Sequence, residues 1–138
     1  THGKLRWQAD EADGHPLLCI VSEEVSEAYL ETLRQQGISW IAVGKGRIDL
    51  PKAMEALSEH FGVKRLAIVG GGHICGGFLE AGLIDEVSIM VAPGIDGRKG
   101  QTAVFDGIAD TGCNPFRLKL ESVERWPTDI VWLRYKMK

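Results

Sequence analysis

Residues 67–79 have the sequence AIVGGGHICGGFL, which predicts a buried strand, a tight turn and the start of a helix. The apolar run is rich in β-branched residues and stops at Gly70, Gly71 and Gly72, after which the residues have helical spacing. Glycine lets a ligand approach the backbone N–H groups of such a turn, and the helix N-terminus adds partial positive charge. The turn therefore predicts a phosphate-binding site, with a glycine turn that binds no ligand as the alternative.

The turn matches neither of the two common nucleotide-binding motifs. The dinucleotide pattern Gly-x-Gly-x-x-Gly, counted from Gly70, needs glycine where this chain has Cys75. A P-loop needs Gly-Lys-Ser or Gly-Lys-Thr after the turn, and neither follows. The prediction of a ligand therefore depends on the backbone of the turn.

The composition is that of one globular domain, which we expect to span residues 1–138. A formal charge of -3 provides no basic surface, so we do not expect nucleic acid as a partner. We find no apolar run of membrane-spanning length and no signal-peptide pattern, and expect no membrane association. The three scattered cysteines, Cys19, Cys75 and Cys113, predict free thiols in a cytoplasmic protein and no metal site.

Three successive αβ units are predicted before residue 93. The strands are expected at 16–21, 38–43, 65–69 and 86–92, and the helices at 24–36, 49–61 and 72–81. Ser22 is the expected N-cap of the first helix and Asp49 that of the second. Continuous apolar strands separated by helices favour a parallel sheet with helices on both faces. Ligands bind such sheets at the carboxyl ends of the strands, here Ser22, Gly44, Gly70–Gly72 and Pro93–Gly94.

The pattern changes after Ala92. Residues 93–115 predict a long loop, and a loop of this length in a compact domain is usually functional. Residues 116–124 and 130–137 alternate apolar and polar side chains around residues 126–129, which predicts an antiparallel hairpin. Six apolar side chains of this hairpin are expected in the core: Leu118, Leu120, Val123, Val131, Leu133 and Tyr135.

With its elements laid out, the chain resembles the dihydrofolate reductase fold and, within it, the reductase domain of riboflavin biosynthesis. The matching runs are residues 61–72, 78–86 and 91–93, and the likeness extends over residues 17–138. The resemblance implies an α/β protein with a three-layer αβα mixed sheet, mostly parallel, that closes with an antiparallel hairpin. It also implies a homodimer, as does the apolar strand Ile130–Leu133, which would be prone to association if exposed.

The resemblance further implies NADPH as the cofactor, with NADH possible. The residues that would hold its pyrophosphate and nicotinamide are Gly70, Gly71, Gly72, His73 and Ile74. Ser22 would meet the adenosine 2′-phosphate, and Gly44 and Lys45 would lie at the adenine. Glu23 and Glu24 depart from this pattern, because basic or neutral residues suit a 2′-phosphate better.

Two other departures concern the substrate. Many riboflavin-type members have a glutamate where this chain has Gly70. The family's chain also opens with two strands, a helix and a substrate loop, which have no counterpart before Pro16. We therefore expect the C-terminal part of a reductase, incomplete at its N-terminus and without its central strands, and no catalytic residue is assigned.

The sequence thus predicts a reductase that transfers hydride from NADPH or NADH to a pterin or to a riboflavin precursor, a ribosylamino-pyrimidine phosphate. The alternative is a nucleotide-binding regulatory or interaction module without catalysis. His73 either bonds the cofactor or is an exposed histidine without a partner. Cys75 is expected as a small buried residue and not as a nucleophile, since no histidine base is fixed near it in the sequence.

Overall fold

The computed structural model describes residues 11–101, 103–109 and 115–138. The chain divides into two compact units, residues 1–66 and residues 67–138, and each is described by itself. The described strands form three separate sheets, which contain both parallel and antiparallel pairs. The mixed α/β class is therefore confirmed, while the expectation of a single domain stays a prediction.

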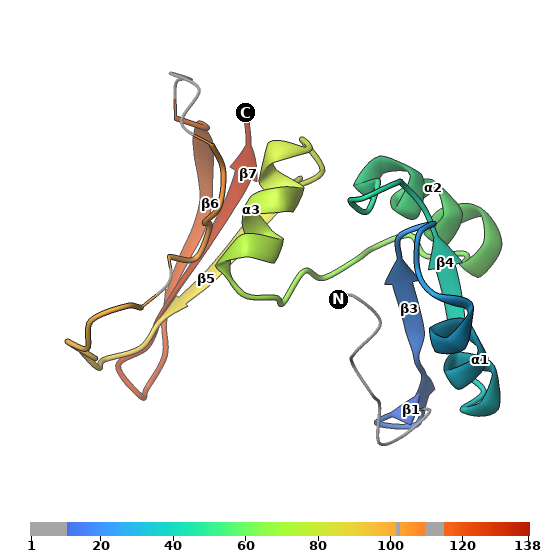
Figure 1. Cartoon of the computed structure of the whole chain (residues 1–138). Helices are drawn as coiled ribbons and strands as arrows, with labels where there is room; N and C mark the ends of the chain where they lie inside the picture. The colour runs from blue at the N-terminus through green and yellow to red at the C-terminus, as the bar shows by residue number, and fades with distance from the viewer. Residues whose placement is uncertain (1–10, 102, 110–114) are drawn as a thin grey trace. The chain divides into compact units, whose positions relative to one another are not determined.

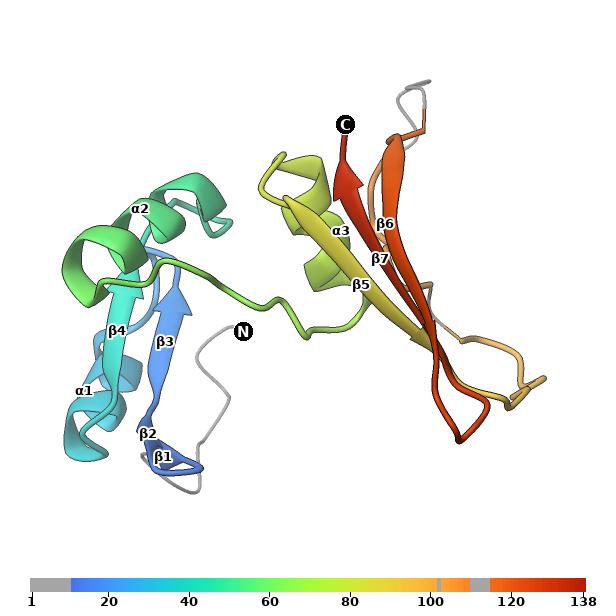
Figure 2. The same ribbon diagram turned by 180° about the vertical axis from the view of Figure 1, so that it is seen from behind.

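The first unit is built on a parallel strand pair. Strand β3 (Leu18–Val21) pairs with β4 (Ser39–Ala42), and helix α1 (Glu27–Gln35) connects them. The short strands β1 (Glu11–Ala12) and β2 (His15–Pro16) precede this pair as a small antiparallel ladder. Helix α2 (Leu50–Phe61) follows β4, as Figures 1 and 2 show. The first two predicted strands and helices are therefore present.

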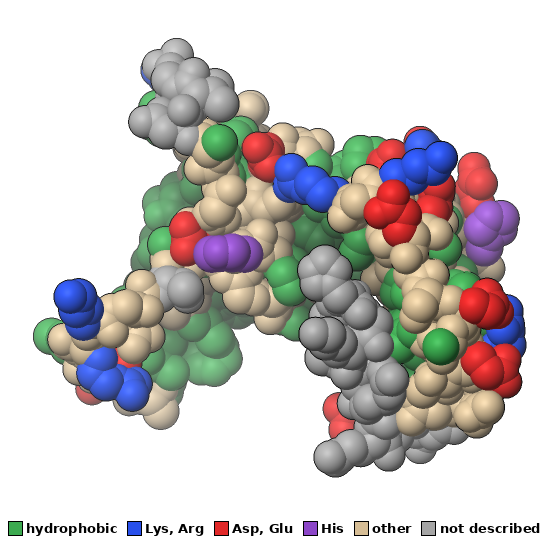
Figure 3. All heavy atoms as spheres, in the orientation of Figure 1, with side chains coloured by type: hydrophobic (Ala, Val, Ile, Leu, Met, Phe, Trp, Pro, Cys, Tyr) green, Lys and Arg blue, Asp and Glu red, His purple; other side chains and the backbone are tan. Residues whose placement is uncertain are grey.

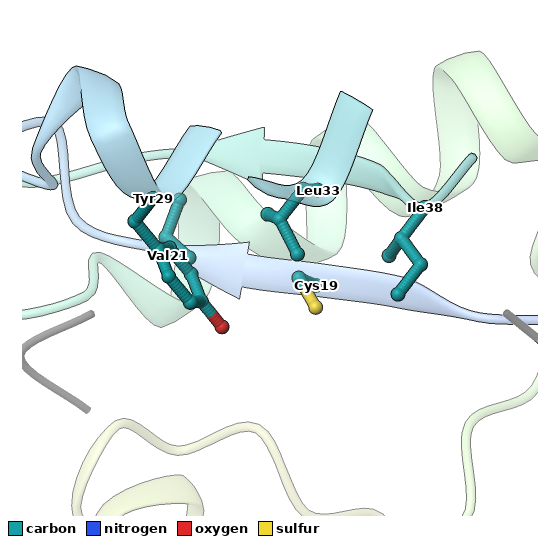
Figure 4. Packing of buried hydrophobic residues seen from close by; sticks show 5 residues of the cluster. All are labelled: Cys19, Val21, Tyr29, Leu33 and Ile38. Carbon is teal, nitrogen blue, oxygen red and sulfur yellow. The ribbon is translucent and has the colours of Figure 1, made fainter. Parts of the chain in front are cut away.

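Helices cover both faces of this pair, as the sequence predicted. Figure 4 shows side chains of β3 meeting those of α1 and of the segment before β4; the cluster is Cys19, Val21, Tyr29, Leu33 and Ile38. Ile41 follows Trp40 in β4 and therefore points to the face of the strand pair away from this cluster. Ile41 is buried, as are Ala53 and Leu57 of α2. In Figures 1 and 2, α1 and α2 lie on opposite sides of the strands.

The cap predicted for α2 is confirmed, and the one predicted for α1 is wrong. The Asp49 carboxylate accepts from the amide of Lys52 at 3.1 Å, and Gly62 ends α2 in a left-handed conformation. Helix α1 begins at Glu27, where the hydroxyl of Ser26 accepts from the amide of Tyr29. The amide of Val25 donates to the carbonyl of Ser22 at 3.1 Å, so the chain makes a turn there before it enters the helix.

The third predicted strand, residues 65–69, is absent from the described elements. Residues 62–71 contain neither helix nor strand, and Val69 is 93% exposed. β-Branched residues favour a strand only where a neighbouring strand accepts and donates backbone hydrogen bonds. No ladder among the described strands includes residues 65–69, and most of these residues are exposed.

The second unit contains helix α3 (Gly72–Glu80) and an antiparallel sheet. Strands β5 (Glu86–Val91), β6 (Leu118–Arg125) and β7 (Val131–Met137) have the order β5-β7-β6. The predicted hairpin β6–β7 is confirmed. The expectation that β5 joins a mostly parallel sheet is wrong for the described strands, because β7 returns beside β5 and pairs with it antiparallel.

Helix α3 packs on one face of this sheet beside β5, while β6 forms an edge (Figures 1 and 2). Phe78, Leu79 and Val87 are buried in this unit. The prediction that the apolar side chains of β6 are core is wrong, since Leu118, Leu120 and Val123 are 38%, 50% and 56% exposed. In Figure 3, hydrophobic side chains gather over the strands of this unit.

Candidate functional site

The glycine turn (Gly70–Gly72) leads directly into α3. Gly71 is the N-cap, and its carbonyl accepts from the amides of Ile74 and Cys75 at 3.0 and 3.1 Å. Gly70 and Gly71 are exposed, and a β-carbon built on Gly71 would meet no atom within 4 Å. The space beside Gly71 is therefore open to a ligand, and the helix N-terminus next to it favours an anion.

Gly72 differs from Gly71 because it is buried under the loop of residues 103–107. The amide of Asp106 donates to the carbonyl of Gly72 at 3.0 Å. A β-carbon on Gly72 would lie 3.0 Å from the β-carbon of Asp106, and one on Gly76 would overlap the carbonyl oxygen of Asp106. Gly72 and Gly76 therefore let the loop lie against α3. Of the three glycines in the turn, only Gly71 has open space where a β-carbon would be.

His73 has an acidic neighbour that the sequence did not reveal. Its Nδ1 lies 3.5 Å from the carboxylate of Asp106, and the two side chains are 74% and 42% exposed. The same carboxylate accepts from the amide of Gly107 at 2.7 Å, which fixes its orientation. The reading of His73 as a histidine without a partner is therefore wrong. Asp106 could not be predicted as this neighbour, because no spacing rule connects a loop residue to a helix so far away in the chain.

The residues beside His73 have structural roles. Ile74 is 55% exposed, and its side chain lies over Gly70, where an added β-carbon would be 2.8 Å from the β-carbon of Ile74. The thiol of Cys75 is buried and donates to the carbonyl of Gly70 at 3.3 Å. Burial of Cys75 is as predicted, and its hydrogen bond helps to hold the glycine turn in shape.

The three candidate residues of the first unit lie where β3 and β4 end. Ser22 and Gly44 are half-buried, and Lys45 is exposed. Gly44 has a φ of +81°, and a β-carbon there would lie 2.6 Å from the amide nitrogen of Asp49. Glycine at position 44 is therefore required by the loop itself. The carboxyl ends of β3 and β4 are adjacent, as expected for a ligand-binding edge.

The structure thus describes two groups of candidate residues. Gly70, Gly71, Gly72, His73 and Ile74 lie at the start of α3, and Ser22, Gly44 and Lys45 lie at the β3–β4 edge. Among the described residues, no group of three or more His, Cys, Asp or Glu side chains is placed to hold a metal ion. No helix within the same residues has the length and apolarity that a membrane crossing requires.

The structure contains a parallel βαβ pair, a glycine turn at a helix N-terminus and an antiparallel closing sheet, which together define a mixed α/β protein. The sequence matches the RibD C-terminal domain over residues 3–132, and the chain belongs to that family.

Named relatives agree with this assignment. The chain is 29% identical over 127 residues to the 2,5-diamino-6-ribosylamino-4(3H)-pyrimidinone 5′-phosphate reductase of Methanothermobacter thermautotrophicus, covering 91% of this chain and 57% of the relative. A pyrimidine reductase-like protein from Corynebacterium diphtheriae superposes with a TM-score of 0.72 at 25% identity, covering 88% of this chain and 50% of that one. RibD of Acinetobacter baumannii shares the fold, with a TM-score of 0.66 at 19% identity, covering 88% of this chain and 37% of that one. The chain spans about half the length of the first two relatives.

Proposed function

We propose that this chain serves a reductase that transfers hydride from a reduced nicotinamide dinucleotide to a ribosylamino-pyrimidine phosphate, a precursor of riboflavin. The observation that carries the proposal is the open backbone at Gly71, at the N-terminus of α3, in a member of the RibD C-terminal domain family. The name of the Methanothermobacter relative supports the pyrimidine substrate and favours it over a pterin.

The residues of this chain fit a dinucleotide, because the space beside Gly71 is empty and the helix end next to it suits a phosphate. In the proposal, the turn at Gly70 and Gly71 holds the pyrophosphate, and His73 with Ile74 borders the nicotinamide end. For the first unit by itself, we propose that Ser22, Gly44 and Lys45 at the ends of β3 and β4 bind an adenosine group. The bound cofactor supplies the hydride, and the protein contributes position and exclusion of water.

The proposal also includes the fold, the location and the oligomeric state of the protein. We propose that it has the three-layer arrangement of the dihydrofolate reductase fold in one domain, that it is cytoplasmic and that it forms a homodimer. The helices on both faces of β3 and β4 support the layers, and Cys75, which forms no disulfide, supports a reducing compartment. The segment Ile130–Leu133 leads into β7, which is the central strand of its sheet, so this segment is not an exposed edge and does not support the dimer. The exposed apolar side chains of β6 support the dimer instead.

The substitution Gly71→Val tests the cofactor site. Its side chain would fill the open space beside Gly71, so we expect dinucleotide binding to be lost. The protein should stay folded, with a melting temperature only a few degrees lower because valine is a poorer N-cap than glycine. Gly97→Val is the matched control, because a β-carbon there also meets no atom within 4 Å, but Gly97 lies in the loop after β5. Isothermal titration of both variants with NADH and NADPH gives the comparison. Equal affinity in wild type and Gly71→Val contradicts the assignment of the turn.

Turnover is tested with the pyrimidinone phosphate named for the Methanothermobacter relative. Loss of reduced-nicotinamide absorbance on addition of this compound is the expected result. Cofactor binding without turnover, in a preparation that contains the whole protein, would favour the nucleotide-binding module without catalysis. Absence of binding by both dinucleotides would reject the enzyme and the module together.

A further inference from the structure

Two glutamates bind the loop that follows β4. The amide of Gly44 donates to the carboxylate of Glu23 at 3.2 Å, and the amide of Gly46 donates to the carboxylate of Glu24 at 3.0 Å. The amide of Glu23 donates in turn to the carbonyl of Gly44 at 2.8 Å. Three hydrogen bonds therefore join residues 22–24 to residues 44–46, and two exposed carboxylates lie at the carboxyl ends of β3 and β4.

These carboxylates occupy backbone donors that a phosphate would otherwise use. An anion at a strand end is bound by backbone N–H groups together with cationic side chains. At this edge, the N–H groups of Gly44 and Gly46 already donate to Glu23 and Glu24. A phosphate would have to displace both carboxylates or approach their negative charge, and like charges at short range are repulsive.

The neighbouring cations do not offset the negative charge that a phosphate would meet at this edge. Lys45 and Arg47 lie in the same loop, so two positive residues are matched by two acidic ones and residues 22–24 with 44–47 carry no excess of positive charge. Lys52, on α2, is 3.2 Å from the carboxylate of Asp49 and is engaged there. Figure 3 shows acidic and basic side chains interspersed on the visible face of this unit. A dianionic phosphate gains little from such a surface, whereas a ribose hydroxyl can donate to a carboxylate.

We infer that Glu23 and Glu24 determine cofactor specificity, and that this chain selects the dinucleotide with a free adenosine 2′-hydroxyl, NADH, over the 2′-phosphorylated NADPH. The inference rests on the proposed function, because it assigns the adenosine end of the dinucleotide to the β3–β4 edge. It goes beyond that function by naming the residues that choose between the two cofactors.

The test compares wild type with the double variant Glu23→Gln and Glu24→Gln. Glutamine keeps an oxygen that accepts from the amides of Gly44 and Gly46, so the loop retains its shape while both charges are removed. Glu55→Gln with Glu59→Gln is the control, since it removes two exposed carboxylates from α2 at the same cost in net charge. Calorimetric titrations use NADH, NADPH and the fragments ADP and 2′,5′-ADP, which carry only the adenosine end.

We expect wild type to bind NADH about tenfold or more tightly than NADPH, and ADP more tightly than 2′,5′-ADP by a similar factor. The Glu23 and Glu24 variant should bind NADPH and 2′,5′-ADP about tenfold more tightly than wild type does, and the control should not. Equal or tighter binding of NADPH by wild type overturns the inference, as does a preference that the double variant leaves unchanged. Either result leaves the proposed function intact if a dinucleotide binds, while failure of all four probes rejects both.

Discussion

The backbone carbonyl of Asp106 lies against Gly76 so closely that no side chain fits between them, and this contact joins the loop of residues 103–107 to the second turn of α3. The amide of Asp106 donates to the carbonyl of Gly72 one turn earlier, which fixes the loop along the helix. The carboxylate of the same residue lies beside His73. One loop residue thus determines how the start of α3 is covered.

The first prediction concerns this contact. Gly76→Ala should lower the free energy of unfolding by about 1–3 kcal/mol, because the new methyl group displaces backbone atoms that cannot rotate away. Alanine favours a helix interior over glycine by up to about 1 kcal/mol, so a loss of stability has to come from the contact. Gly77→Ala, in the same helix, is the control. Urea denaturation measures both, and a Gly76→Ala variant more stable than wild type would contradict this packing of the loop on α3.

The second prediction concerns the loop after β4. Gly44 and Gly46 both have positive φ values, +81° and +69°, but only Gly44 is crowded by neighbouring backbone. Gly46→Ala should therefore cost about 1 kcal/mol from backbone strain alone. Gly44→Ala should cost about 1–3 kcal/mol more, because its β-carbon overlaps the chain between Arg47 and Asp49. Thermal unfolding of the two variants gives the difference, and equal melting temperatures would show that the loop relaxes.

The third prediction concerns the cap of α2. The amide of Lys52 donates a hydrogen bond to the Asp49 carboxylate, and this lowers the pKa of Asp49 below its ordinary value. The side chain of Lys52 contributes a second, smaller lowering. Because the folded-state pKa is depressed, the cap stabilises the protein above the unfolded pKa of about 4, and this contribution is lost as the pH falls through the folded value. Asp49→Ala should lower the melting temperature by a few degrees at neutral pH and by less in acid. Asp49→Asn keeps the acceptor oxygen and should retain most of the stability. An Asp49→Ala effect that does not vary with pH would contradict the charged cap.

The fourth prediction concerns association. The apolar face of β6 should lie in the interface of the proposed homodimer, since Leu120 and Val123 are about half exposed in the single chain. Leu120→Glu should shift the protein from dimer to monomer at micromolar concentration. Lys119→Glu is the control, because adjacent strand residues point to opposite faces. Light scattering measures the mass of each variant, and a wild-type monomer under these conditions would reject the dimer.

Features that depend on neighbouring residues could be predicted from the sequence, whereas features that depend on distant contacts could not. The predictable ones include the ends of α2, which Asp49 caps and Gly62 terminates, and the turn at residues 126–129 between β6 and β7. Ser22 was a plausible cap on local grounds, but the hydrogen bonds of Glu23 and Glu24 with the loop after β4 hold the chain in a turn until Ser26. A contact with another strand end decided where that helix begins.

By itself, the sequence determined the parallel βαβ pair, the glycine turn before α3, the closing hairpin and the likeness to the riboflavin reductases. Each of these depends on hydrogen bonds and side-chain periodicity within a short stretch of chain, which the order of residues specifies directly. Only the tertiary structure decided that β7 lies between β5 and β6, that residues 65–69 join no described ladder, and that Asp106 lies on α3 beside His73. These features depend on which distant backbone groups pair and on where a missing side chain leaves room, as at Gly76. Strand propensity and residue spacing predict neither the partner of a strand nor the neighbour of a glycine, because the packing of the whole unit determines them.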